Sequence, residues 1–119
     1  MNKAHKNLKV WREAIGLTKL VYHVTSKLPD GEKFGLVSQM RRAAVSIPSN
    51  IAEGAARQTK KDSLHFYIIA RSSLSELDTQ LELCKSLNFL SVEHCIEMFQ
   101  KMDAVDALLS GLIRFQRKI

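Results

Sequence analysis

The chain has 119 residues, of which 45% are hydrophobic and 7% aromatic, and its formal net charge at pH 7 is +6. This length suits one domain, residues 1–119, with a single and mostly aliphatic core. No apolar run approaches the roughly 20 residues of a membrane-spanning helix, so the sequence predicts no membrane span. The positive charge favours anionic partners such as nucleic acid, anionic lipid headgroups or acidic proteins.

Four helical segments are predicted, separated by short breaks. The first covers residues 8–28 and stops at a Pro-Asp-Gly turn, and the second covers residues 35–57. The third follows Thr59, which has the spacing of a helix cap with Asp62, and continues to Leu87. Asn88 breaks that helix, and Ser91 is the expected cap of a fourth segment that runs nearly to Ile119.

The predicted helices are similar in length, roughly 30 to 40 Å at 1.5 Å per residue, and their links are short. Short links make consecutive helices antiparallel neighbours. The sequence therefore predicts an all-α fold, an antiparallel up-down-up-down four-helix bundle.

The first segment carries two adjacent apolar stripes at helical spacing. One consists of Val10, Ala14, Leu17, Val21, Val24 and Leu28, and the other of Leu8, Trp11, Ile15, Thr18, Tyr22 and Thr25. A helix at the surface of a monomeric bundle needs only one such stripe. The second stripe indicates either a deeply buried helix or contact with another subunit, and it favours a homo-oligomer.

Patterns typical of catalysis or metal binding are absent from the sequence. The four histidines, His5, His23, His65 and His94, show no metal-ligand spacing, and the glycines form no phosphate-binding loop. Cys84 and Cys95 have apolar neighbours and no C-x-x-C pairing, which favours reduced thiols in the cytoplasm. We therefore expect no enzyme activity, no metal and no cofactor.

The most unusual stretch is residues 39–57, QMRRAAVSIPSNIAEGAAR. Its apolar stripe lies beside a polar stripe that uses Ser, Asn and Arg where an ordinary solvated helix uses Lys and Glu. Ser46 and Ser49 are small enough for a close helix contact, while Glu53 and Arg57 have the spacing of a surface ion pair. Arg41 and Arg42 point about 100° apart, so only one can share the polar stripe, and Arg42 is the better candidate.

Pro48 lies in the middle of this stretch. It removes one helical hydrogen bond, at a cost of about 3 kcal/mol, and leaves the Ala44 carbonyl without its usual donor. We expect a kink or bulge there, with a Ser or Arg side chain as the replacement donor.

These residues resemble the small bacterial four-helix-bundle proteins associated with intervening sequences of 23S ribosomal RNA genes. The similarity spans LKVW at 8–11, VY at 21–22, the long segment at 35–57 and IARSSLSELDTQL at 69–81. It implies a homopentamer with a central pore and no established enzyme activity. It also implies a structural relation to a basic, pentameric accessory protein of retroelements that binds nucleic acid and a reverse transcriptase. The motif positions are Arg41, Arg42, Ser46, Pro48, Asn50, Glu53, Gly54 and Arg57.

Two functions follow as hypotheses. The first is phosphate-directed, weakly sequence-specific binding of RNA or DNA, because the excess of positive charge lies in the first half of the chain. The cations expected to bind are Arg41, Arg42, Arg57, Lys60 and Lys61, with Arg41 and the last three in one region. The packing residues expected to order the bundle are Ser46, Pro48, Ser49, Asn50, Glu53 and Gly54. The alternative is an oligomeric scaffold that binds protein.

Overall fold

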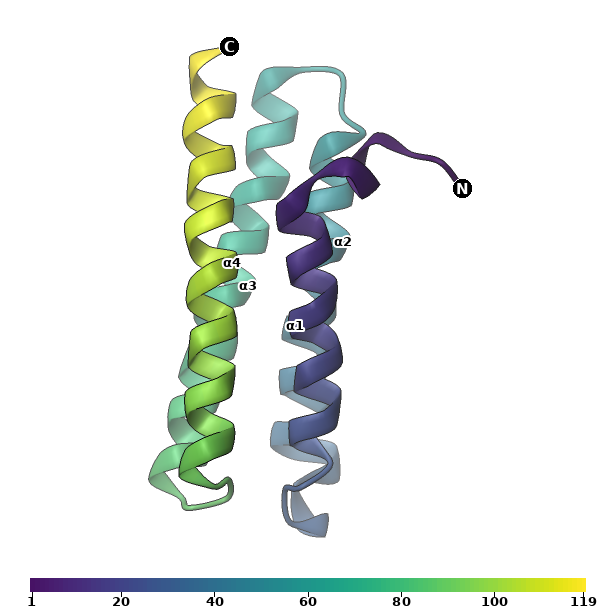
Figure 1. Ribbon diagram of the computed structural model, residues 1–119. Helices are drawn as coiled ribbons and strands as arrows, with labels where there is room; N and C mark the ends of the chain where they lie inside the picture. The colour runs from purple at the N-terminus through teal and green to yellow at the C-terminus, as the bar shows by residue number, and fades with distance from the viewer.

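The structure is a computed structural model of residues 1–119, and it consists of four long helices without strands. The helices are α1 (Lys9–Thr25), α2 (Ser38–Ala55), α3 (Lys60–Ser86) and α4 (Val92–Lys118). Consecutive helices run in opposite directions, which confirms the predicted up-down-up-down bundle (Figure 1). None of the helices is both long enough and apolar enough to span a bilayer.

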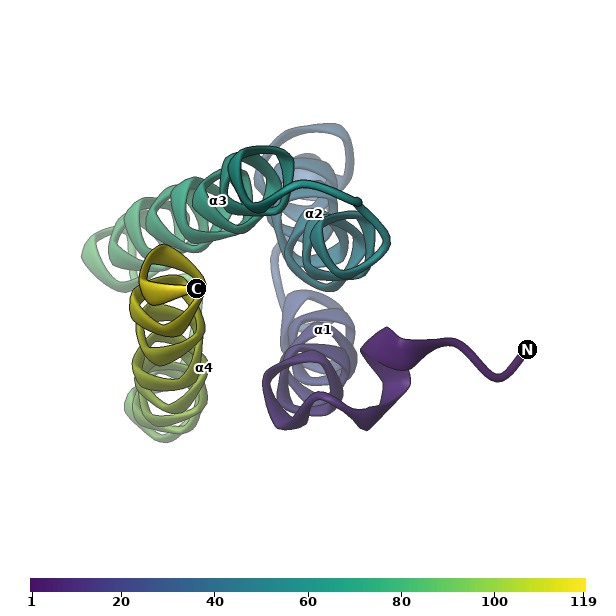
Figure 2. The same cartoon turned by 90° about the horizontal axis from the view of Figure 1, so that it is seen from above.

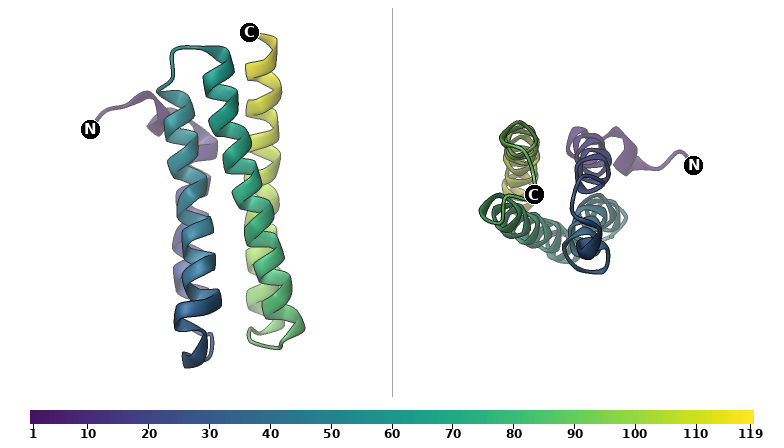
Figure 3. Two further views of the ribbon diagram at one scale, coloured as in Figure 1. Left: turned by 180° about the vertical axis from the view of Figure 1, so that it is seen from behind. Right: turned by 90° about the horizontal axis from the view of Figure 1, so that it is seen from below.

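The helices occupy the corners of a quadrilateral in chain order, so that α1 lies next to both α2 and α4 (Figure 2). The view from below places α1 and α2 on one side, with α3 and α4 on the other (Figure 3). Between them lies one core of 23 buried apolar residues contributed by every helix. The solvent-exposed faces of α1 and α2 therefore point away from those of α3 and α4.

Local capping interactions fix the ends of α3 and α4 where the sequence predicts them. The hydroxyls of Thr59 and Ser91 accept hydrogen bonds of 3.1 Å from the backbone N–H groups of Asp62 and His94. Asn88 adopts a left-handed conformation, with φ of 58°, and Phe89 N–H donates back to the Cys84 carbonyl at 2.9 Å. This pattern ends a helix because it satisfies the last carbonyl groups.

The start of the second helical segment differs from the sequence-based expectation. A short 3₁₀ turn, η2 (Asp30–Glu32), leads into a π-helical turn, η3 (Lys33–Val37), before α2 begins at Ser38. Inside η3, Gly35 has φ of −109° and ψ of −110°, and the Glu32 carboxylate accepts a hydrogen bond from Leu36 N–H. The break in helical geometry at Gly35 turns Phe34 into solvent, where it is 89% exposed.

The structure shows how α2 accommodates a proline. α2 continues as an α-helix through Pro48, which is buried. The donor to the Ala44 carbonyl is Thr18 of α1, whose hydroxyl lies 3.1 Å from that oxygen and 2.9 Å from the Ala14 carbonyl. The expected Ser or Arg donor was therefore wrong, because the neighbouring helix supplies the hydrogen bond.

The two stripes of α1 have different environments in the chain. The stripe that begins at Val10 is fully buried, as expected for the core. The other is half-buried along most of its length, with Thr25 inside and Tyr22 44% exposed. The second stripe therefore packs only partly within the bundle.

Candidate nucleic-acid interface

Several side chains of residues 39–57 connect α2 to α3. The Ser46 and Ser73 hydroxyls are 2.8 Å apart, and the Asn50 amide donates to the Ser46 carbonyl at 2.8 Å and to its hydroxyl at 3.0 Å. All three residues are half-buried. The Ser46–Ser73 hydrogen bond therefore joins α2 to α3, and Asn50 holds the Ser46 hydroxyl from within α2.

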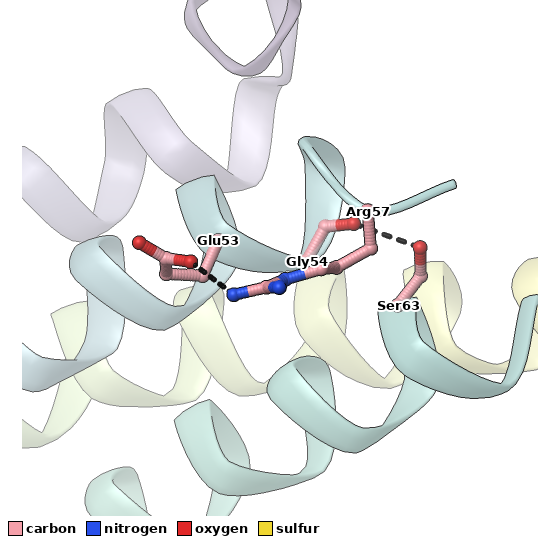
Figure 4. A network of polar contacts seen from close by, with 4 residues as sticks. All are labelled: Glu53, Gly54, Arg57 and Ser63. Carbon is pink, nitrogen blue, oxygen red and sulfur yellow. Dashed lines mark hydrogen bonds and ion pairs between the residues drawn. The ribbon is translucent and has the colours of Figure 1, made fainter. Parts of the chain in front are cut away.

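α2 and α3 are in close contact at Gly54. A Cβ atom on Gly54 would lie 2.4 Å from Cε1 of Tyr67, a separation too short for any side chain. The Ser63 hydroxyl donates to the Gly54 carbonyl at 2.8 Å, which joins the end of α2 to the first turn of α3 (Figure 4). Position 54 therefore has no room for a side chain larger than that of glycine unless the Tyr67 ring moves.

Ser49 and Glu53 lie on the outside of the chain. Both residues are exposed. Ser49 therefore forms no close helix contact within the bundle, and its expected packing role was wrong for the single chain. Glu53 forms the predicted ion pair with Arg57, at 2.8 Å (Figure 4). The Arg57 guanidinium also lies over the Phe66 ring, 4.4 Å from its centroid.

Neither of the two adjacent arginines joins the polar stripe of Ser46 and Glu53. Arg41 donates to the Thr25 hydroxyl at 3.0 Å and to the Tyr22 carbonyl at 3.3 Å, and its guanidinium lies 4.6 Å from the centre of the Tyr22 ring. Arg42 is exposed and is not part of the Ser and Glu53 network. Arg41 therefore ties α2 to the end of α1, while Arg42 is free to meet a partner.

The five candidate cations are divided between two places. Arg41 and Arg42 lie within the first two turns of α2, whereas Arg57, Lys60 and Lys61 lie around the link from α2 to α3. The 16 residues between Arg41 and Arg57 correspond to about 24 Å along a helix. The expectation that Arg41 shares one region with Arg57 and the lysines was wrong.

The topology instead gathers other basic residues around Arg57, Lys60 and Lys61. In an up-down-up-down bundle the start of α1, the link from α2 to α3 and the end of α4 meet at one end, at the top of Figure 1. We call this the basic end. Its exposed cations are Lys3, Lys6, Lys9, Arg12, Arg57, Lys60, Lys61, Arg114, Arg117 and Lys118.

The charge of the molecule is concentrated at this basic end. Residues 1–13, 53–62 and 114–119 contain ten of the 18 Lys and Arg residues but only three of the 12 Asp and Glu residues. The basic end therefore carries +7, while the rest of the chain, with eight basic and nine acidic residues, carries −1. Of the three carboxylates, Glu13 and Glu53 already form ion pairs, with Lys101 and Arg57.

Sequence reasoning missed the terminal contribution to the basic end. The segment 114–118 has the composition expected for the end of a helix, where cations interact favourably with the helix dipole. Its sequence, RFQRK, also places Phe115, which is 60% exposed, among three cations. The sequence does predict the antiparallel topology, and from that topology the meeting of these segments at one end could have been predicted.

Comparisons with known proteins agree with this fold. The chain is similar to a protein of unknown function from the S23 ribosomal protein family of Bacteroides thetaiotaomicron. The TM-score is 0.82 and the identity 22%, over 88% of this chain and 95% of that one. No curated protein matches the sequence.

The model of one protein family matches most of the chain. The match spans residues 6–111, which include Ser46, Asn50, Gly54 and the link from α2 to α3. The chain therefore belongs to the family of 23S rRNA-intervening sequence proteins.

Proposed function

We propose that this protein binds RNA or DNA through the basic end of its bundle. The observation that carries the proposal is the convergence of three basic segments, distant in sequence, on one end with a charge of +7. Flexible Lys and Arg side chains around helix ends suit phosphate oxygens better than base edges, so the binding is directed at the backbone and weakly sequence-specific. No catalytic step is part of the proposal.

We further propose that the protein acts as a homo-oligomer, with five subunits as its family resemblance implies. The half-buried second stripe of α1 supports an intersubunit contact, because Tyr22 and its neighbours leave apolar surface exposed in the single chain. In a closed ring of parallel copies, every basic end lies on the same face. The ring then presents several patches of +7 to one nucleic-acid strand, which raises the avidity.

The test of nucleic-acid binding is a titration of the protein with RNA and with DNA at two salt concentrations. Logarithmic affinity is expected to fall nearly linearly with the logarithm of salt, by about 0.9 per phosphate neutralised on duplex DNA and about 0.7 on single strands. Changing Lys60 and Lys61 to Ala should reduce both the affinity and this slope. The matched control changes Lys19 of α1 and Lys27 of the turn after it, both exposed and away from the basic end, to Ala.

Equal losses in the two double variants would show that only net charge matters and would remove the basic end as the site. No binding at low salt by the wild-type protein would end the nucleic-acid proposal. An oligomer that binds no nucleic acid would support the alternative, a protein-binding scaffold.

A further inference from the structure

The end of α4 extends beyond the start of α1. A Cβ atom added to Gly16 would lie 3.2 Å from Cε of Lys101, and the centres of the His23 and His94 rings are 6.3 Å apart. Both pairs of residue numbers add up to 117, and such a sum stays nearly constant along two antiparallel helices. The start of α1 therefore lies opposite residue 108, and the rest of α4 extends about 15 Å beyond it (Figure 1).

The side of α4 that faces α1 remains apolar beyond that point. His94 and Lys101 mark this side, and residues spaced by four or seven positions lie on the same side of a helix. Beyond Lys101 this spacing selects Leu108, Leu112, Phe115 and Ile119. We call these four residues the α4 stripe. Its first two residues are half-buried against the core, whereas Phe115 and Ile119 are 60% and 61% exposed.

The segment that precedes α1 leaves the exposed part of the α4 stripe uncovered. Its short helix, η1 (Ala4–Asn7), contacts α1 and α2, and the first residues of the chain point away from α4 (Figure 2). The Phe115 ring is therefore available to another molecule.

Positive charges border the α4 stripe. Lys9 and Arg12 precede Gly16 by seven and four residues, so they lie on the side of α1 that faces α4. Lys118 lies about one turn beyond Phe115 on α4 itself. These three cations are exposed and none of them forms an ion pair. No Asp or Glu occurs within seven residues of Phe115 in the sequence, so the exposed ring has cations and no carboxylates as its charged neighbours along the helix.

An exposed aromatic ring among unpaired cations suits a polyanion that carries flat apolar groups. A single strand of RNA or DNA has this chemistry, because its unpaired bases can leave their stack and lie on a ring while its phosphates contact Lys and Arg side chains. In a duplex the bases are paired and stacked on one another, so that the phosphates alone are free to meet such a surface. The α4 stripe therefore favours single strands.

We propose that the α4 stripe stacks unpaired bases of a nucleic-acid strand whose phosphates are bound by the basic end. Phe115 supplies the stacking surface, and Lys9 and Lys118 contact the phosphates on either side of the stacked base. The protein then binds single strands more tightly than duplexes. This inference rests on the function proposed above, the binding of RNA or DNA at the basic end, and adds the class of nucleic acid.

The test compares two probes of equal length, single-stranded oligothymidylate and its duplex with oligoadenylate, by fluorescence anisotropy at one low salt concentration. Phe115→Ala should lower the affinity for the single strand between about fivefold and a hundredfold, the loss expected for one stacked base, and the duplex affinity by less than about twofold. Phe115→Tyr should keep the wild-type affinities, because its ring also stacks. Lys118→Gln should lower both affinities, because it removes a phosphate contact.

The matched control is Phe34→Ala, which removes an exposed ring at the other end of the bundle. The readout is the ratio of single-strand to duplex affinity, because a change of oligomeric state alters both affinities. This ratio should fall in Phe115→Ala and stay at the wild-type value in the control, while circular dichroism checks the helical fold of each variant.

The outcomes separate this inference from the proposed function. A wild-type protein that binds neither probe at low salt would overturn both together. Equal wild-type affinities for the two probes, or an equal effect of Phe115→Ala on both, would overturn the stacking site alone. Binding to phosphatidylserine vesicles that Phe115→Ala abolishes, at an unchanged affinity ratio, would assign the α4 stripe to lipid and overturn the inference as well.

Discussion

Two glycines in helices allow packing and backbone effects to be separated at the scale of single residues. Gly54→Ala should destabilise the protein by about 1 to 3 kcal/mol, because the new Cβ collides with the buried Tyr67 ring. Gly111→Ala should stabilise it by roughly 0.5 to 1 kcal/mol, because the nearest atom, an Arg114 nitrogen, is 3.8 Å away and alanine favours a helix. Unfolding in denaturant measures the free energy of unfolding of both variants. Equal effects in the two variants would contradict a close contact at Gly54.

Arg41 and Arg42 form a second matched pair. Arg41→Ala removes hydrogen bonds to Thr25 and Tyr22 and the contact with the Tyr22 ring, and should cost about 1 kcal/mol of stability. Arg42→Ala should change the stability of the single chain by less than about 0.5 kcal/mol, because its side chain is exposed and unpaired. Thermal unfolding in dilute solution compares the stabilities of the two variants. A larger loss of stability in the Arg42 variant than in the Arg41 variant would support the sequence-based prediction that Arg42 belongs to the polar stripe of α2.

At the scale of elements, α1 and α4 are connected by a single ion pair. Lys101 passes over Gly16, where an added Cβ would lie 3.2 Å from the Lys101 Cε atom, and donates to the Glu13 carboxylate at 2.7 Å. The hydrogen bond and the positive charge of Lys101 lower the pKa of Glu13. Both side chains are about one third exposed, so solvent screens the pair and its contribution to stability is small.

The direction of this pH dependence follows from the lowered pKa. A carboxyl whose pKa is lower in the folded state stabilises the fold above its usual pKa, and this contribution is lost as the pH falls through the folded-state value. Lys101→Met should move the pKa of Glu13 back toward the usual range, whereas Lys101→Arg should preserve the lowered value. Carboxyl titration by NMR measures the shift. The same Glu13 pKa in the wild type and the Met variant would rule out the ion pair in solution.

At the scale of the whole molecule, we expect a mass of five times the 13.5 kDa chain by light scattering. The apolar side chains exposed in the single chain, above all Phe34 and Tyr22, supply surface that association would bury. The oligomer should weaken as salt is raised if the contact is mainly electrostatic, because salt screens exposed charges. A single-chain mass at tens of micromolar would contradict the expectation.

The sequence by itself determined the helices, their ends and their antiparallel order. The caps at Thr59 and Ser91 and the left-handed turn at Asn88 depend on residues no more than five positions apart, so local chemistry is enough to predict them. The buried stripe of α1 follows from helical periodicity in the same way. The entry into α2 was less predictable, because the irregular turn at Gly35 depends on how the short link packs.

Only the tertiary structure decided which polar side chains meet. Thr18 supplies the hydrogen bond that Pro48 leaves open, and Arg41 rather than Arg42 is held within the bundle, because both depend on the rotation of α1 against α2. The basic residues at the two termini and at the link from α2 to α3 come close to one another only when the four helices lie side by side. Sequence spacing measures distance along one helix, whereas the basic end depends on which helix ends lie next to one another in the bundle.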